Sequence, residues 1–228
     1  MKHYLIIGGS NGIGKSLASK LKEHARVTAT YFNNQSDLDG DITWHHHDSM
    51  NPNFDWMPEE LDGLVYCPGS IQLKPFKRFK SEDFVEDYKL NVVGAVESIQ
   101  AALPSLKKTK NASIVLFSTV AVQNGFNFHS LVSSSKGAIE GLGKALAAEL
   151  APTVRVNVIA PSLTQTQLSQ NLLNSEQKIE HNAQRHPLKR IGQAEDVANL
   201  AELLLTEKGS WITGQVLKID GGLSTLKI

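Results

Sequence analysis

Short apolar runs alternate with longer amphipathic segments along the whole chain. Their apolar content predicts strands at Tyr4–Ile7, Arg26–Tyr31, Thr43–His47, Gly63–Cys67, Ser113–Phe117, Val154–Ile159 and Gln215–Ile219. Helical spacing predicts helices over Lys15–Leu21, Ser81–Lys89, Asn91–Leu106, Ser133–Leu150 and Ala194–Leu205. Strands that alternate with helices form parallel βαβ units with right-handed crossovers. The pattern therefore predicts an α/β protein with one doubly wound parallel sheet of about seven strands and helices on both faces.

The organisation along the chain indicates a single domain over residues 1–228, because no repeat, low-complexity tract or linker interrupts it. The stretch 162–190 is long for a connection and carries polar, helix-forming residues. Doubly wound sheets bind ligands beyond the carboxyl ends of their strands. We therefore expect residues 162–190 to form a lid over a site there.

The glycine-rich stretch after the first apolar run carries the strongest chemical signal. Glycines let the backbone take positive φ and let a pyrophosphate approach, and the amides of a helix N-terminus attract negative charge. Because this stretch joins a strand to a helix, it predicts a dinucleotide site rather than a tight turn without a ligand. The expected cofactor contacts there are Gly8, Ser10, Asn11, Gly12, Ile13 and Gly14.

Composition narrows the range of partners. The chain has 23 basic and 23 acidic residues, so no charge excess suggests nucleic acid or an anionic membrane as a partner. A single cysteine, Cys67, excludes a disulfide within the chain and suits a reducing compartment. No apolar run approaches the roughly 20 residues of a membrane span. We expect a cytoplasmic protein.

The chain resembles the short-chain dehydrogenase/reductase family nearly from end to end. The motifs that carry the resemblance are the glycine turn, Asp48 after the third strand, Asn91 in Leu90–Gly94, Lys136 in Ser133–Gly137, the strand Arg155–Pro161, and the tail from Pro187–Gly192 through Ile212–Gly214 to Asp220–Gly222. The resemblance implies a Rossmann-type NAD(P)-binding domain that transfers hydride to or from a carbonyl or an activated C=C bond. It implies further cofactor contacts at Tyr31, Asp48, Cys67, Gly69, Asn91, Lys136, Pro161, Thr164 and Thr166.

One departure from the family pattern concerns catalysis. The family has a tyrosine four residues before the lysine and a serine thirteen residues before that tyrosine; these positions are Val132 and Thr119 here. Valine cannot transfer a proton, and general acid–base catalysis requires a titratable group within hydrogen-bond reach. The tyrosines of the chain, Tyr4, Tyr31, Tyr66 and Tyr88, all lie outside this helix.

The remaining catalytic set is therefore expected to work with altered proton delivery. By resemblance, Lys136 holds the nicotinamide ribose, Asn91 holds a relay water and Thr119 bonds the substrate oxygen. The proton comes either from a lysine-bound water or from His129, which precedes Lys136 by seven residues, a spacing similar to that of the family's enoyl-thioester reductase branch. The alternative is a catalytically inactive NADP-binding sensor or partner subunit.

The end of the second strand favours NADP(H) over NAD(H). An NAD enzyme places an acidic residue there for the ribose 2′-OH, whereas this chain has Tyr31 and no acid until Asp37. No arginine stands at Ser10 or Asn33 to clamp a 2′-phosphate, although both side chains can donate hydrogen bonds and Lys15 is nearby. The preference rests on the missing acid.

The run His45-His46-His47 invites a metal interpretation that strand geometry argues against. Neighbouring side chains on a strand point to opposite faces, so at most His45 and His47 share one side. Two ligands do not make a zinc site. We expect no metal.

Substrate and assembly are only coarsely indicated. The lid leucines Leu163, Leu168, Leu172 and Leu173 suit a small apolar or amphipathic substrate. The long helix after Lys136 has a stripe of small residues, Gly137, Gly141, Ala145 and Ala148, and the tail Leu223–Ile228 is partly apolar. The small-residue stripe and the apolar tail both predict a homotetramer, or at least a dimer.

Overall fold

A seven-stranded, entirely parallel sheet forms the centre of the computed structural model, which describes residues 1–38 and 40–227. Ile228, the last residue of the predicted tail, lies outside the described residues. The strands are β1 (His3–Ile7), β2 (Arg26–Tyr31), β3 (Ile42–His46), β4 (Gly63–Tyr66), β5 (Ala112–Phe117), β6 (Val154–Pro161) and β9 (Val216–Ile219). Each lies within two residues of its predicted bounds.

The strand order is β3-β2-β1-β4-β5-β6-β9, so the direction of winding reverses between β1 and β4. This is the doubly wound Rossmann-type sheet that the alternating pattern predicts. Ile7 at the end of β1 pairs with Tyr66 at the end of β4. The crevice in which such sheets bind ligands therefore opens directly beyond these two residues.

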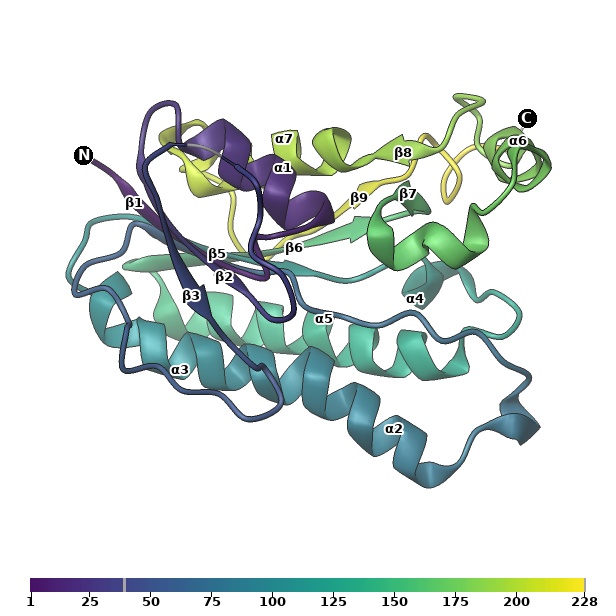
Figure 1. The fold of residues 1–228 in the computed structure, drawn as a ribbon, viewed down its shortest axis with the longest axis horizontal. Coiled ribbons are helices and arrows are strands. Elements are labelled where there is room, and N and C mark those ends of the chain that lie inside the picture. Colours follow the sequence, from purple (N-terminus) through teal and green to yellow (C-terminus); the bar gives the residue numbers. More distant parts are fainter. Residues whose placement is uncertain (39, 228) are drawn as a thin grey trace.

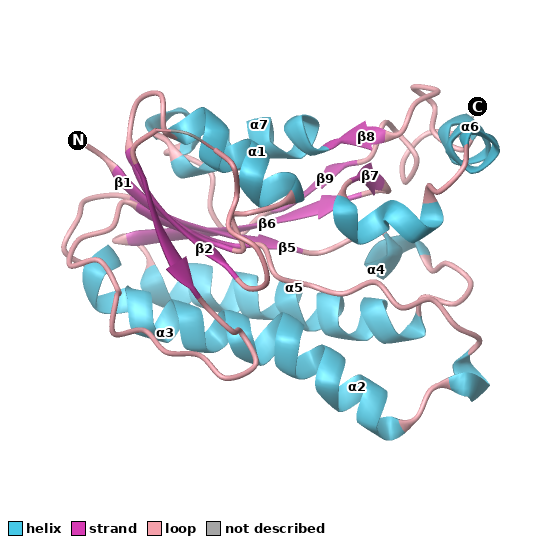
Figure 2. Ribbon diagram, viewed as in Figure 1, coloured by secondary structure: helices cyan, strands magenta, loops and turns pink. Residues whose placement is uncertain are grey.

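Helices cover both faces of the sheet (Figure 1). Helices α1 (Gly12–Leu21) and α7 (Ala194–Leu205) pack on one face. Helices α2 (Ser81–Tyr88), α3 (Gly94–Leu106) and α5 (Ser130–Leu150) lie on the other, as Figure 2 also shows. Because side chains alternate along a strand, Ile6 enters the core under α1 and α7, whereas Leu5 enters the core under α3 and α5.

The long helical segment before β5 is not one uniform helix. Between α2 and α3 the backbone forms a π-helical turn over Lys89–Val93. Helix α5 also begins at Ser130, three residues before its predicted start. The described residues further include short elements that the apolar pattern did not predict: the 3₁₀ turns Phe76–Arg78 and Glu207–Gly209 and the short helix α4 (Ala121–Asn124).

The segment 162–190 is more ordered than a plain loop. It contains β7 (Thr164–Gln165), a 3₁₀ turn over Gln167–Leu172 and α6 (Glu176–Gln184), and β7 pairs with β8 (Gly192–Gln193). A small core of its own, centred on Leu173, Ala183 and Ile191, packs this segment. It lies at the end of the sheet where β6 finishes (Figure 1).

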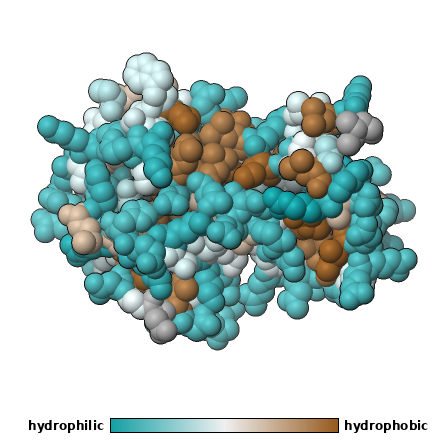
Figure 3. Space-filling model, turned by 90° about the horizontal axis from the view of Figure 1, so that it is seen from above, coloured by the Kyte–Doolittle hydropathy of each residue, from teal (hydrophilic) through white to brown (hydrophobic). Residues whose placement is uncertain are grey.

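The molecular surface is hydrophilic over much of the face that carries α1 and α7, with apolar patches between the polar side chains (Figure 3). In the described part of the chain, no helix combines the length and the apolar character needed to cross a bilayer.

Candidate cofactor and active site

The turn between β1 and α1 has the backbone geometry of a phosphate cradle. Gly8 and Gly12 take positive φ angles of 77° and 52°. A Cβ on Gly14 would stand 2.2 Å from the carbonyl oxygen of Gly8, so the turn closes tightly onto the helix. Asn11 at the N-cap makes no side-chain bond to the first turn of α1. The amides at this helix end are thus left for an anionic ligand.

Two other segments flank this turn. A Cβ on Gly12 would stand 3.3 Å from Cβ of Thr166, and a Cβ on Gly8 would stand 3.1 Å from Cδ of Pro68. The segment 162–190 and the loop after β4 therefore both approach the glycine turn. Three separate stretches of sequence meet here at the sheet crevice.

Asn91 and Lys136 face one small space beside Gly69. The position of a Cβ on Gly69 lies 3.2 Å from Oδ1 of Asn91 and 3.4 Å from Nζ of Lys136. Asn91 is fully buried, and its Oδ1 accepts no hydrogen bond from the described residues. Its Nδ2 donates to the carbonyl of Asp87 at 2.9 Å. A buried amide oxygen with no protein partner needs a water or a ligand group.

The π-helical turn presents Asn91 to this space. Such turns are rare and occur mostly at functional sites. The hydroxyl of Tyr66, at the end of β4, donates to the carbonyl of Leu90 at 2.6 Å. This bond ties the π-helical turn to the carboxyl end of β4, which leads into the loop that holds Gly69.

Burial shifts the pKa values of Lys136 and Cys67 in opposite directions. Burial lowers the pKa of Lys136 to about 8, and the negative charge of Asp87 opposes part of that effect. Burial raises the pKa of the Cys67 thiol to about 12. Cys67 is therefore a neutral thiol near neutral pH and not a nucleophile. Lys136, by contrast, can gain and lose a proton near neutral pH.

Of the two hydroxyl residues after β5, Thr119 is the more exposed. Ser118 is buried and donates to Oε1 of Glu140 at 2.6 Å. Thr119 is partly exposed, and its hydroxyl oxygen accepts from the amide of Ala121 at 3.3 Å. That contact leaves the Thr119 proton free to be donated.

Val132 lies on helix α5, whereas His129 lies just before the start of that helix. Val132 is buried, with 6% of its surface exposed, one turn before Lys136 on α5. His129 precedes α5; its Nδ1 lies 2.8 Å from the carbonyl of Asn127, and its ring packs edge-on against Phe126. At 1.5 Å rise per residue, the seven residues to Lys136 span about 10 Å along the helix. No contact among the described residues joins His129 to the rest of the site.

The far end of the crevice, past β2 and β3, carries Tyr31 and Asp48. The ring of Tyr31 packs edge-on against His46 at 5.8 Å. The Asp48 carboxylate accepts bonds from the Met50 amide at 2.8 Å and the Asn51 side chain at 3.1 Å, and these bonds lower its pKa. Lys15 on α1 forms an ion pair with Asp37, a contact that sequence reasoning did not anticipate.

The other two members of the histidine run pack against aromatic rings. His45 stacks on Trp56 at 4.8 Å, and buried His47 packs against Phe54 at 5.2 Å. Within the described residues, no three side chains of the metal-binding types are gathered at one place.

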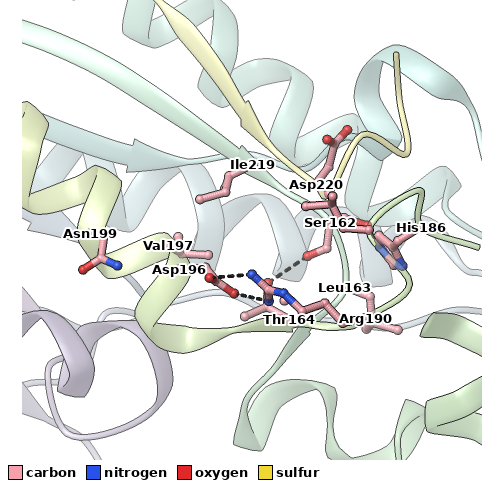
Figure 4. Close-up of a pocket in the computed structure, with 13 residues that line it drawn as sticks. Ser162, Leu163, Thr164, His186, Arg190, Asp196, Val197, Asn199, Ile219 and Asp220 are labelled. Carbon is pink, nitrogen blue, oxygen red and sulfur yellow. Dashed lines mark hydrogen bonds and ion pairs between the residues drawn. The ribbon is translucent and has the colours of Figure 1, made fainter. Parts of the chain in front are cut away.

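A separate cavity of about 250 Å³ lies between the segment 162–190, the start of α7 and the ends of β6 and β9 (Figure 4). Thr164 lines it and donates to the carbonyl of Ser162 at 2.9 Å. Arg190 crosses it to form a two-bond pair with Asp196 at 2.6 and 2.8 Å. Thr164 thus lines this cavity, while Thr166 adjoins the glycine turn. Pro161, the last residue of β6, leads into the same segment.

Comparison with known proteins identifies the family. The family model described as enoyl-(acyl carrier protein) reductase matches residues 53–224. The chain belongs to the short-chain dehydrogenase/reductase family. A curated relative, the human 3-oxoacyl-[acyl-carrier-protein] reductase, is 30% identical over 238 residues, covering 97% of each chain. The resemblance inferred from the motifs is confirmed, and the chain is an NAD(P)-dependent oxidoreductase of this family.

Solved structures of this family agree in fold. A short chain dehydrogenase family protein from Francisella tularensis superposes with a TM-score of 0.92 at 26% identity, covering 99% of this chain and 100% of that one. A tyrosine-to-phenylalanine variant of ElxO with NADPH bound superposes with a TM-score of 0.88 at 29% identity and 99% coverage of each chain. A nicotinamide cofactor is therefore bound by structural neighbours of this short-chain dehydrogenase/reductase.

One buried residue of this site was missed by sequence reasoning. Asp87 is 4% exposed, and its carboxylate accepts hydrogen bonds from the hydroxyls of Ser70 and Ser135. The only sequence signal was an acidic residue one turn before Asn91. Nothing in the apolar pattern distinguishes it from the solvent-facing acids of the same helix, such as Glu82 and Glu86.

Proposed function

We propose that this short-chain dehydrogenase/reductase reduces a small carbonyl or activated C=C substrate with NADPH, and that Lys136 supplies the proton through a water held by Asn91. The observation that carries the proposal is the shared space beside Gly69. The unpartnered Oδ1 of Asn91 and the Nζ of Lys136 both border it. A water in that space can accept from the ammonium and donate to the amide oxygen.

The residues at the head of α1 fit a nicotinamide nucleotide. Positive φ at Gly8 and Gly12, the close approach at Gly14 and the free helix amides suit a pyrophosphate. When bound, the cofactor supplies the hydride. Residues of this protein carry out all the other steps.

Proton transfer then proceeds without a phenol. As hydride adds to the substrate carbon, the C=O π bond breaks and its electron pair moves to oxygen. The Thr119 hydroxyl donates a hydrogen bond to that oxygen. The oxygen takes a proton from the water, which takes one from the Lys136 ammonium, and the neutral amine is reprotonated from solvent.

Substrates that form an enolate need the missing tyrosine least. An oxyanion can be stabilised first by hydrogen-bond donors and protonated later at carbon. Activated C=C bonds are therefore favoured over simple ketones, which need a proton in the same step. His129 is the less supported donor, because its ring contacts Asn127 and Phe126 instead of the site.

The preference for NADPH over NADH rests on Tyr31 at the end of β2, where an NAD enzyme has an acid. The ElxO variant with NADPH bound supports a cofactor with a 2′-phosphate in this fold. Asp37, which pairs with Lys15, is 86% exposed at its side chain, so a 2′-phosphate can compete for the Lys15 ammonium in water.

The lid leucines differ in exposure, and Leu172 is partly buried. Leu163 and Leu173 pack in the core of the lid, whereas Leu168 is 51% exposed. Leu168 is thus the better candidate for contact with an apolar or amphipathic substrate. The small-residue face of α5 supports a homo-oligomer, and the single cysteine supports a cytoplasmic location.

The test is NADPH consumption with a panel of ketones and enoyl thioesters. We expect turnover that is lost in Lys136→Met and kept in Lys144→Met, which changes an exposed lysine on the same helix. Inactivity of the unaltered protein against both substrate classes, with cofactor binding shown by calorimetry, contradicts the proposal. That result favours the alternative function, a catalytically inactive NADP-binding sensor or partner subunit.

A further inference from the structure

The buried side of α2 is unusual. Its single buried residue is Asp87, which is 4% exposed, while Phe84 is only partly buried and Val85 is 67% exposed. Aspartate is almost never fully buried unless it is paired. The placement of a carboxylate on the inner face of this helix therefore requires an explanation from its surroundings.

Both carboxylate oxygens of Asp87 are engaged by hydroxyl donors. Ser70 donates to Oδ1, and Ser135 donates to Oδ2 at 2.5 Å. Both oxygens therefore act as hydrogen-bond acceptors, as a carboxylate does. The backbone carbonyl of the same residue accepts from Nδ2 of Asn91. Asp87 thus joins the loop after β4, the π-helical turn and α5.

These contacts bring the carboxylate to the residues beside Lys136 and Gly69 in sequence, and its charge acts on Lys136. Ser135 directly precedes Lys136, and Ser70 directly follows Gly69, whose Cβ position is 3.4 Å from the ammonium. Two titratable groups among the described residues act on Lys136: Asp87 from α2 and Cys67 from the end of β4. Since the Cys67 thiol is neutral near neutral pH, Asp87 is the one negative charge that acts on the lysine within the described part of the chain.

We propose that Asp87 is a positioning residue of the active site, whose fixed negative charge retains the Lys136 ammonium and aims it at the space it shares with Asn91. The inference rests on the proposed role of Lys136 as the proton source and extends it. A buried ammonium tends to lose its proton, and a nearby anion counteracts that tendency. Without Asp87, Lys136 becomes a neutral amine at a lower pH and has no proton to give.

The experiment measures the proton on Lys136 directly, without turnover. Acetylation of Lys136 by acetic anhydride is followed by mass spectrometry across a pH series, because only the neutral amine reacts. In Asp87→Asn we expect the midpoint for Lys136 to fall by about one pH unit or more. In Glu86→Gln, which removes an exposed charge one residue away on the same helix, we expect no change. An unchanged midpoint in Asp87→Asn, or an equal fall in Glu86→Gln, overturns the proposal.

A double variant keeps the test decisive if Asp87→Asn does not fold. If the unfolding comes from an uncompensated ammonium, Asp87→Asn combined with Lys136→Met removes both charges and restores the circular dichroism of the native fold. A double variant that is also unfolded overturns the proposal. Because neither readout needs a substrate, failure here is distinct from failure to find reductase activity.

Discussion

Val132 lies one helical turn before Lys136 on α5 and is buried, with 6% of its surface exposed. The helix that carries both residues is regular and packs on the sheet as expected of the family. By the resemblance of the motifs, the aliphatic side chain of Val132 stands where the family has a proton-donating tyrosine. Lys136 and Asn91 border one space beside Gly69, and Val132 brings no titratable group to the helix turn before Lys136.

Lys136 as proton source predicts a specific pH dependence. Burial lowers its pKa to about 8, so its ammonium form is lost as the pH rises through that value. We expect the kcat for reduction, measured at saturating NADPH, to be highest below pH 8 and to fall about tenfold for each pH unit above it. A rate that stays level well beyond pH 8 contradicts Lys136 as the donor.

The same pKa gives a stability prediction. The folded-state pKa of Lys136, about 8, lies below the ordinary lysine value of 10.5, so between these values the unfolded chain binds more protons. Stability therefore rises with pH over that window because of this group. We expect Lys136→Met to reduce the rise, compared with Lys144→Met, in urea unfolding at several pH values. An identical pH dependence in the two variants argues against a depressed lysine.

Replacing Val132 with tyrosine tests whether the missing phenol limits the chemistry. A positioned general acid contributes roughly 10²–10⁴-fold, so we expect Val132→Tyr to raise ketone reduction by on the order of 10²-fold. Val132→Phe is the matched control, since it adds the ring without the hydroxyl. If Val132→Tyr instead abolishes an activity that Val132→Phe keeps, the native site uses a different proton route.

The fold was predictable because its signals are local. The apolar spacing of Ala194–Leu205 gave both ends of α7, and the β-branched run at Arg26–Tyr31 gave β2. The π-helical turn was missed because its five residues, Lys89–Val93, are too few to show a period of their own in the apolar pattern. The short strands β7 and β8 were missed because two residues carry no periodicity, and only their pairing defines them.

Part of the geometry of the candidate site also follows from local sequence patterns. One short stretch of sequence holds the three glycines of the turn, Gly8, Gly12 and Gly14. The segments around Asn91 and Lys136 match the pattern of the short-chain dehydrogenase/reductase family. Asp87 could not be found in this way. Its role depends on Ser70 and Ser135, which are far from it in sequence, and no local pattern encodes such a contact. The Lys15–Asp37 ion pair was not predicted for the same reason.

Cofactor preference is tested by calorimetric titration with NADPH and NADH. We expect both to bind and NADPH to bind more tightly by about 1–3 kcal/mol, through donors near Ser10 and Asn33. Tyr31→Asp adds a carboxylate at the end of β2, where the proposal puts the 2′-phosphate, so it should weaken NADPH binding far more than NADH binding. Equal affinities for the two nucleotides mean that the phosphate is merely tolerated, and tighter binding of NADH refutes the preference.

The exposed face of α5 predicts self-association. Gly141, Ala145 and Ala148 are all exposed, and a Cβ on Gly141 would meet nothing within 4 Å in the isolated chain. A partner helix can therefore approach closely, and closed two-fold symmetry is the usual outcome for such a self-complementary face. We expect a tetramer, or at least a dimer, by light scattering at micromolar concentration.

Gly141→Glu should dissociate that assembly, because it brings two unpaired like charges together across the symmetry axis. The single chain has room for the new side chain, so its own thermal unfolding should change little. Gly141→Ala, which stays small and neutral, should remain associated. If the unaltered protein is a monomer, the small residues of α5 have no role in assembly; if Gly141→Glu stays associated, the interface lies on another face.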